Sequence, residues 1–370
     1  MSKISIIGAG SIGATTAFAL LQKGVATEII INDINQEKAL GEVLDLIHGS
    51  SLCKPCKISL GTLEDTANSD IIIITAGLAQ KPGETRLDLV DKNYNIFKSF
   101  IPTLAKLSPN SILLVVSNPV DILAYMTYKL SGFPKNRVIG SGTVLDTARL
   151  RSLLGKYFEI DGRNVEGYVL GEHGDSEFVA WSELSIGNIP VKSFSEQFNI
   201  EWDKETENVI ATDVKNAAYE VINRKGATAF SVALALVRIV EAFLGDEKSI
   251  LTVSTLLEDY LGVSNAYLSV PTIVGKNGIE KVLDISLSDE EKVKILEEAL
   301  SKYNVYEILA SYKRKGVKNP LTQDDVNFIL SNLEKTNVEI AERLNISEDR
   351  VSSIRNGKSY KDYIKNYYSQ

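Results

Sequence analysis

The chain has 370 residues, with 40 lysines and arginines against 48 aspartates and glutamates, a net charge of −8, and 44% of it is hydrophobic. This balance is typical of a globular protein and argues against disorder along the whole chain. The acidic excess argues against a protein that coats nucleic acid with its whole surface, although a local basic module remains compatible with it. There is no apolar run of about 18 residues and no signal-peptide pattern, so we expect a cytoplasmic protein without a membrane span.

Short β-branched runs alternate with amphipathic helical stretches through the first part of the chain. The expected strands are 4–7, 28–31, 71–75, 112–116 and 137–139. The expected helices between them include 12–23, 36–48 and 88–107. Such alternation predicts a doubly wound parallel sheet of the α/β class.

From about residue 143 the pattern is mixed, with a strand at 165–170 and helices at 203–223, 227–244 and 288–312. We therefore predict a nucleotide-binding domain at 1–142 and an α+β substrate domain at 143–312. A basic stretch rich in helix breakers at 313–320 predicts a linker, and short helices predict an all-α appendage at 321–370.

A glycine-rich turn follows the first expected strand and opens the first expected helix. Its G-x-G-x-x-G glycines would make a tight turn, admit a pyrophosphate and let helix pack on strand. An aspartate 33 − 13 = 20 residues beyond the last glycine can bind ribose hydroxyls and would repel a 2′-phosphate, which favours NAD over NADP. The predicted residues of this Rossmann-type site are Gly8, Gly10, Ser11, Ile12, Gly13 and Asp33.

The two cysteines form a C-x-x-C motif, Cys53 to Cys56, with His48 upstream. A redox pair or a metal site is conceivable on this spacing. However, the motif precedes a strand-like run at 57–60 instead of opening a helix, and three ligands do not close a zinc site. We expect two reduced thiols and no metal.

Candidate catalytic residues stand near expected strand ends. His173 lies between glycines after a strand, and an imidazolium there could give a proton to a ketone as it accepts hydride. Asp146 is a candidate to orient it, although alone it could equally be a helix N-cap. Arg149 suits a substrate carboxylate, and Arg86 stands on a polar loop that could close over the site.

In combination, these motifs resemble the L-lactate dehydrogenase branch of the lactate/malate dehydrogenase family, over residues 3–312. The stretches that carry the resemblance are 8–13, 75–77, 80–89, 116–119, 140–154, 171–177, 225–228 and 270–275.

The resemblance implies a mechanism. His173 would donate a proton to the carbonyl of pyruvate and recover it from lactate, while Asp146 would hold His173 and stabilise its cation. Arg149 would bind the substrate carboxylate, and Arg86 would polarise the carbonyl. The resemblance further assigns Asn118 and Thr228 to the substrate pocket, and Thr75, Ala76, Gly77 and Asn118 to the NAD site.

Substrate choice would depend on Gln80, where malate enzymes of the family carry an arginine. A neutral amide leaves the second carboxylate of oxaloacetate unpaired, which favours pyruvate and lactate. The family also implies a tetramer. Arg151 matches an arginine that binds fructose 1,6-bisphosphate in bacterial relatives, but Glu166 replaces the accompanying histidine, which argues against this activation.

The last 58 residues, 313–370, lie beyond the resemblance and carry 11 basic minus 8 acidic residues, or +3. The apolar spacing at 340–358 resembles a small helix-turn-helix module. Possible DNA contacts are Arg350, Arg355, Lys358 and Lys361. A protein partner is the alternative for this tail.

Two rival functions remain open on the sequence. One is a dehydrogenase for malate or another 2-oxoacid. The other is a DNA-binding regulator that uses the enzyme fold to sense NADH or lactate.

Overall fold

The structure is a computed structural model that describes residues 2–78 and 86–299, and for residues 86–88 it describes the backbone alone. The chain divides into two compact units, Met1–Glu298 and Ala299–Gln370. The predicted linker and helix-turn-helix module lie outside the described residues, as do Gln80 and the end of the helix expected at 288–312.

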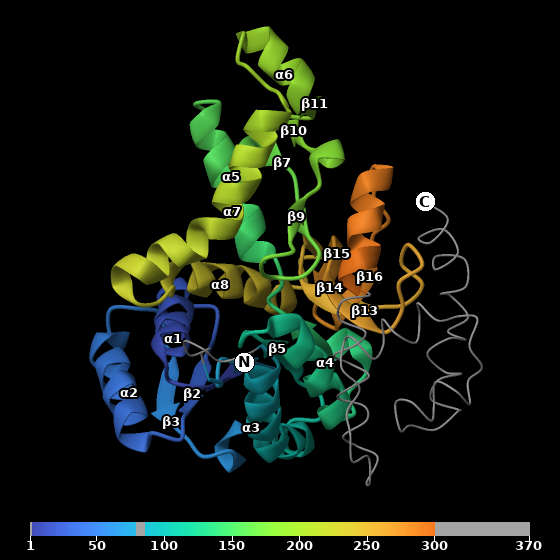
Figure 1. The fold of residues 1–370 in the computed structure, drawn as a ribbon. Coiled ribbons are helices and arrows are strands. Elements are labelled where there is room, and N and C mark those ends of the chain that lie inside the picture. The colour runs from blue at the N-terminus through green and yellow to red at the C-terminus, as the bar shows by residue number, and fades with distance from the viewer. Residues whose placement is uncertain (1, 79–85, 300–370) are drawn as a thin grey trace, which may run out of the picture. The chain divides into compact units, whose positions relative to one another are not determined.

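An eight-stranded sheet forms the centre of the first unit, in the order β14-β13-β6-β5-β4-β1-β2-β3 (Figure 1). Its parallel strands are β1 (Lys3–Ile7), β2 (Glu28–Asn32), β3 (Lys57–Leu60), β4 (Ile71–Ile74), β5 (Ile112–Val115) and β6 (Val138–Gly140). Antiparallel strands β13 (Ser254–Leu257) and β14 (Ala266–Ser269) extend the β6 edge. The order 3-2-1-4-5-6 is that of a Rossmann fold, which confirms the predicted fold class for this part of the chain.

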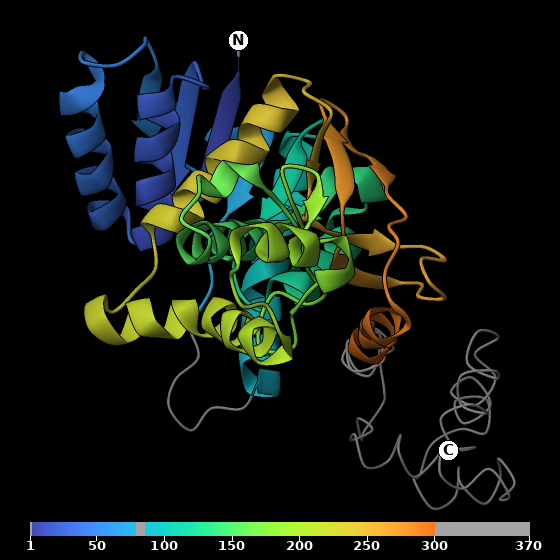
Figure 2. The ribbon, with the colours of Figure 1, turned by 90° about the horizontal axis from the view of Figure 1, so that it is seen from above.

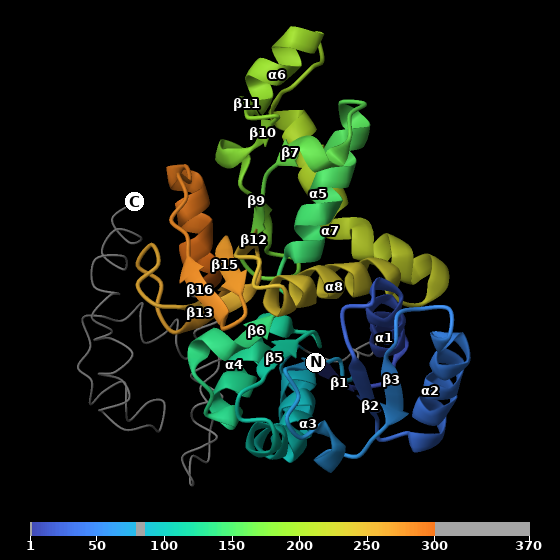
Figure 3. The same ribbon diagram turned by 180° about the vertical axis from the view of Figure 1, so that it is seen from behind.

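The connecting helices are α1 (Ser11–Lys23), α2 (Gln36–Ser50), α3 (Arg86–Leu107) and α4 (Val120–Ser131), with short 3₁₀ turns at Glu64–Thr66 and Lys135–Arg137. Alternate residues of the parallel strands, among them Ile4, Ile29 and Ile71, share one apolar core with α1, α2 and α8 (Phe230–Leu244). Strand geometry turns the intervening residues to the other face. On that side of the unit, α4 packs on β5, β6, β13 and β14 and beside α3 (Figure 3).

Helix α8 comes late in the chain but packs beside α1, as the view from above shows (Figure 2). The remaining helices of the second half are α5 (Val144–Tyr157), α6 (Val191–Phe198) and α7 (Lys204–Lys225). A further helix begins at residue 289 and continues to the end of the described residues at 299. None of the described helices is both long and apolar enough to cross a membrane.

Small sheets complete the second half. Their strands are β7 (Val165–Glu166), β8 (Val169–Leu170), β9 (Phe178–Val179), β10 (Ser185–Ile186), β11 (Ile189–Pro190), β12 (Ser249–Leu251), β15 (Thr272–Gly275) and β16 (Gly278–Val282), with 3₁₀ turns at Gly162–Asn164 and Trp181–Glu183. A second apolar core joins α5, α6 and α7 to β7, β8 and β9.

The prediction of one strand at 165–170 is wrong. β7 pairs with β10, whereas β8 pairs with β9 in a separate sheet. The chain changes sheets at Gly167, where a Cβ atom would lie 2.6 Å from the side chain of Leu184. That close approach separates two runs that the apolar pattern of the sequence joins.

Candidate active site

The glycine turn between β1 and α1 is shaped by close backbone contacts. Gly8 has a φ of +111°, and a Cβ atom there would lie 2.7 Å from the amide nitrogen of Ala76. A Cβ atom on Gly13 would lie 1.9 Å from the carbonyl oxygen of Gly8. A Cβ atom on Gly10, in contrast, would meet nothing within 4 Å. The first and third glycines therefore serve packing, while the second leaves space open beside the turn.

That open space lies at the N-terminus of α1, where Gly10 is the N-cap. No side chain caps this helix, and its first turn holds no acidic residue. Uncapped N–H groups and the helix dipole favour an anion. The turn therefore fits the pyrophosphate of a dinucleotide, and Ser11, Ile12 and Gly13 would bring their N–H groups to it.

Asp33 follows β2, and the fold brings it to the glycine turn. Its Oδ2 accepts a hydrogen bond of 2.6 Å from the Ala9 amide, and its Oδ1 accepts one of 2.8 Å from the Asn35 amide. These two bonds fix the carboxylate beside the turn, where the ribose of a bound dinucleotide would lie.

Thr75 directly follows the neighbouring strand β4 and ties it to the same turn. Its hydroxyl donates to the carbonyl oxygen of Gly8 at 2.9 Å. Ala76 and Gly77 continue from it, and the Ser117 hydroxyl donates to the Ala76 carbonyl oxygen at 2.6 Å. These residues lie where the strand order reverses between β1 and β4, the switch point at which such sheets bind ligands.

Asn118 precedes α4 and forms a cis peptide bond with Pro119. Its side-chain oxygen accepts from the Val120 amide at 3.3 Å. Its carbonyl oxygen accepts from the side chain of Asn93, a wholly buried residue of α3 that also binds both backbone groups of Leu78. Asn93 could not be recognised from the sequence, because a single asparagine within a helical pattern gives no signal.

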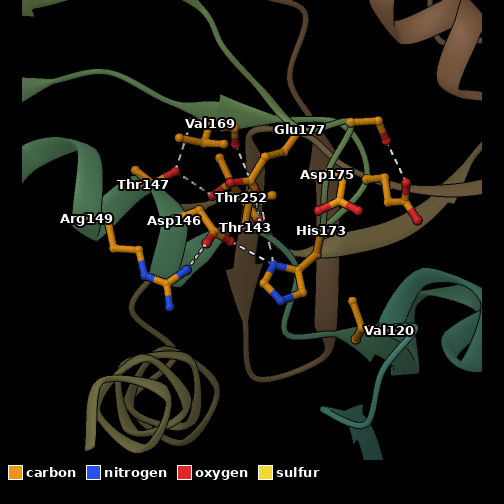
Figure 4. Close-up of polar contacts among 12 residues, drawn as sticks. Val120, Thr143, Asp146, Thr147, Arg149, Val169, His173, Asp175, Glu177 and Thr252 are labelled. Atoms are coloured by element: carbon orange, nitrogen blue, oxygen red, sulfur yellow. Dashed lines mark hydrogen bonds and ion pairs between the residues drawn. The ribbon is translucent and has the colours of Figure 1, made fainter. Parts of the chain in front are cut away.

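His173 lies in residues 171–177, which connect β8 to β9 and are called the catalytic loop below. Its Nδ1 lies 2.8 Å from Asp146 Oδ2, and Asp146 Oδ1 accepts from Arg149 Nη1 at 2.6 Å (Figure 4). Asp146 is 1% exposed, whereas the side chain of His173 is 24% exposed. The structure thus brings together the three residues that the sequence proposed for acid–base chemistry and carboxylate binding.

Helix α5 is tied to β8 next to this group. The Thr143 hydroxyl donates to the Val169 carbonyl oxygen, and the Val169 amide donates to the Thr147 hydroxyl (Figure 4). Helix α5 has Thr143 as its N-cap, so Asp146 stands within the first turn. The alternative that Asp146 is itself the N-cap is wrong, because α5 begins at Val144, two residues before Asp146.

Neighbouring charges set the protonation of His173 and Asp146. Burial lowers the pKa of His173, but the charge and hydrogen bond of Asp146 outweigh burial and raise it to about 9. Burial opposes ionisation of Asp146 as well, and the imidazolium and guanidinium beside it nevertheless hold its pKa below the ordinary value. At neutral pH the pair is therefore an imidazolium and a carboxylate.

Glu177 is a further member of the group that sequence reasoning missed. It is 3% exposed, its Oε2 lies 3.9 Å from His173 Nδ1, and that oxygen has no hydrogen-bond partner among the described residues. Burial and the charge of Asp146 raise its pKa to about 8. Asp146, His173 and Glu177 are close enough together to hold a metal ion, but His173 Nδ1 already binds Asp146.

The structure gives fewer contacts for the other predicted residues. Thr228 is half-buried between α7 and α8, and Arg86 opens α3 but its side chain is not described. Arg151 lies on α5, with a buried Nε that has no partner in the described part of the chain. Glu166 lies on β7, where its carboxylate accepts from the Ser185 hydroxyl at 3.3 Å.

Cys53 and Cys56 lie in the segment between α2 and β3. Cys53 and Cys56 are free thiols that pack against the main core. Burial and the charge of Glu28 raise the pKa of Cys56, which favours the unreactive thiol.

Comparison with known proteins agrees with this geometry. Residues 2–140 match the NAD binding domain of lactate/malate dehydrogenase, and residues 143–304 match the α/β C-terminal domain. The chain belongs to the lactate/malate dehydrogenase family, and its cofactor is NAD.

Individual relatives have more specific names than the family model. The chain is 57% identical over 298 residues to an L-lactate dehydrogenase of Clostridium botulinum, covering 80% of this chain and 94% of the relative. It is 56% identical over 298 residues to L-lactate dehydrogenase 1 of Clostridium acetobutylicum, covering 80% of this chain and 95% of that relative. A solved structure of the minor L-lactate dehydrogenase from Enterococcus mundtii superposes with a TM-score of 0.80 at 39% identity, over 83% of this chain and 98% of the other.

Proposed function

We propose that this NAD-dependent enzyme interconverts pyruvate and L-lactate. The observation that carries the proposal is the contact with Asp146 that fixes the ring of His173. Asp146 binds its Nδ1 at 2.8 Å, which leaves Nε2 as the nitrogen that can face a substrate (Figure 4). With a pKa raised to about 9, His173 holds a proton for transfer at neutral pH.

Bound NADH would supply the hydride. His173 gives the Nε2 proton to the developing alkoxide of pyruvate and, in the reverse direction, takes the proton of the lactate hydroxyl. Asp146 stabilises the charged ring before the transfer and keeps its orientation afterwards. The cofactor would lie on Gly8–Gly13, Asp33 and Thr75–Gly77.

Arg149 binds the substrate carboxylate in this proposal. Only its Nη1 bonds to Asp146, and its planar guanidinium has further N–H donors in a fork that matches a carboxylate. Its side chain is 14% exposed, so an ion pair formed there is poorly screened by water. Arg86 would polarise the carbonyl, and Asn118 and Thr228 would line the pocket.

The choice of pyruvate over oxaloacetate rests on Gln80. The names of the similar proteins support it, since the relatives described above are L-lactate dehydrogenases. Steady-state kinetics with both oxoacids test the proposal. We expect a large preference for pyruvate, and an exchange of that preference in Gln80→Arg. A wild-type preference for oxaloacetate would instead favour the malate alternative.

We also propose self-association, up to the tetramer that the family resemblance implies. Large apolar side chains are exposed on the adjacent helices α1 and α8, namely Phe18 at 58%, Phe230 at 70% and Leu234 at 58%. Exposed apolar patches of this kind mark interaction surfaces. Sedimentation velocity should give a multiple of the mass of one chain, and Leu234→Glu should reduce it.

For residues 313–370, we propose a DNA-binding role on sequence pattern alone. A mobility shift titrated with salt should compare the intact protein with a 1–312 variant. Binding that is lost on truncation supports the role, whereas binding that survives truncation rejects it. Full turnover by the truncated protein would also support an enzyme over the alternative of a DNA-binding regulator.

A further inference from the structure

The catalytic loop is held through three successive backbone amides, each by a different element. The Gly171 amide donates to the Ser269 carbonyl oxygen of β14 at 3.0 Å. The His173 amide donates to Asp121 Oδ2 at the start of α4, also at 3.0 Å. The Glu172 amide between them donates to the carboxylate of Glu298. Two carboxylates and one carbonyl therefore fix the backbone that carries the imidazole.

Glu298 reaches the loop from the helix that begins at residue 289, far along the chain from His173. Its side chain is 5% exposed. Its two carboxylate oxygens lie 2.1 and 2.5 Å from the position that a Cβ atom on Gly171 would occupy, and Gly171 has a φ of +93°. Only glycine fits that backbone and that neighbour. The start of the catalytic loop is thus shaped to receive this carboxylate.

A buried carboxylate is costly unless it accepts hydrogen bonds. A bond from an amide to a carboxylate is also stronger than one between neutral groups. The Glu298 carboxylate therefore binds the Glu172 amide strongly, and Glu172 directly precedes His173. A shift of the Glu172 amide would turn the His173 side chain away from Asp146, and a misplacement of about 1 Å in such a group lowers turnover by ~100-fold.

We propose that Glu298 is a positioning residue, which sets the place of His173 by binding the Glu172 amide. This inference rests on the proposed function, in which His173 transfers the proton. Glu298 does not touch the substrate itself. Glu298 acts by holding the Glu172 amide in place, so an isosteric glutamine, whose side-chain oxygen still accepts that hydrogen bond, should keep the function.

The same helix offers a matched control in Glu291. Glu291 is also 5% exposed, and its carboxylate accepts from the Ser182 amide at 3.1 Å and from the Ser288 amide at 2.8 Å. These bonds hold the helix but do not reach the catalytic loop. Glu291→Ala therefore measures what weaker docking of the helix does by itself.

The experiment compares Glu298→Ala, Glu298→Gln and Glu291→Ala in the full-length protein. We expect Glu298→Ala to lower kcat for pyruvate by ~10- to 100-fold with little change in the Kd for NADH. Its pH profile of kcat/KM should also move to lower pH, because the ring leaves Asp146. Glu298→Gln should recover most of the activity, whereas Glu291→Ala should lower Tm and leave kcat and the profile close to wild type.

Wild-type kcat and pH profile in Glu298→Ala would overturn the proposal, and so would an equal loss in Glu291→Ala. If Glu298→Ala does not fold, Glu298→Asp replaces it, because it withdraws the carboxylate by one methylene and should show the same changes. His173→Asn distinguishes a failure of the proposed function from a failure of the role proposed for Glu298. Turnover in that variant refutes the proposed function, whereas an inactive His173→Asn with a normal Glu298→Ala refutes only the role of Glu298.

Discussion

Asp146 Oδ2 and His173 Nδ1 lie 2.8 Å apart, although one residue belongs to α5 and the other to the loop between β8 and β9. The two Asp146 oxygens serve different partners, since Oδ1 binds Arg149. One buried carboxylate thus orients both the proposed proton donor and the proposed carboxylate-binding residue. Its charge also decides the pH at which the donor holds its proton.

Asp146→Asn should therefore change the pH dependence as well as the rate. The Asp146 charge raises the pKa of His173 to about 9. Pyruvate reduction needs the protonated ring, so kcat/KM should hold up to about pH 9 and fall above it, while lactate oxidation should rise through the same range. In Asp146→Asn both limbs should move toward the ordinary pKa of about 6.5. The rate should fall at least ~100-fold.

Profiles in both directions measure this. Asp146→Ala is a useful companion, because it removes both the charge and the hydrogen bond. A limb that stays near pH 9 in Asp146→Asn would show that another group sets the pKa of the proton donor.

Glu177→Gln should act only in the alkaline range. Burial raises the pKa of Glu177 to about 8, so it is mostly neutral below that pH and charged above it. Once charged, it lies 3.9 Å from His173 Nδ1 and favours the imidazolium. The variant should keep its turnover near pH 6.5 and lose activity for pyruvate at a lower pH than the wild type.

Titration of kcat/KM for pyruvate between pH 6 and pH 10 would test this. A large loss at pH 6.5 would contradict it, because it would assign Glu177 a role beyond its charge.

The sequence predicted the Rossmann core because each of its signals is local. Gly8, Gly13 and Asp33 lie within one strand–turn–helix–strand unit, and their spacing alone indicates how they meet. Glu177 and Glu298 could not be found in this way. Glu177 matters because it is buried beside His173, and Glu298 matters because its helix, from the far end of the unit, reaches the catalytic loop. The sequence shows neither, since a glutamate in a polar or helical pattern most often faces water.

The two glycines Gly10 and Gly13 provide a matched pair for the cofactor site. A methyl group on Gly13 would lie 1.9 Å from the Gly8 carbonyl oxygen, so Gly13→Ala must disturb the turn. A methyl group on Gly10 meets no protein atom within 4 Å. We expect Gly13→Ala to lower Tm, and Gly10→Ala to keep Tm while it weakens NADH binding, because the methyl group occupies space that the pyrophosphate needs.

Thermal unfolding and NADH fluorescence titration distinguish the two. Unimpaired NADH binding by Gly10→Ala would indicate that the dinucleotide does not approach the turn at this glycine.

Arg149→Lys should separate carboxylate binding from proton transfer. The lysine keeps a positive charge near Asp146, so the pKa of His173 should change little. It lacks the planar fork, however, and the loss of one charge-assisted hydrogen bond costs about 2 kcal/mol. That corresponds to a ~30-fold lower kcat/KM for pyruvate, chiefly through KM. Arg151→Lys, two residues along the same helix, is the control and should leave KM unchanged. If Arg149→Lys instead lowered kcat alone at an unaltered KM, Arg149 would act on the His173–Asp146 pair and not on the carboxylate of the substrate.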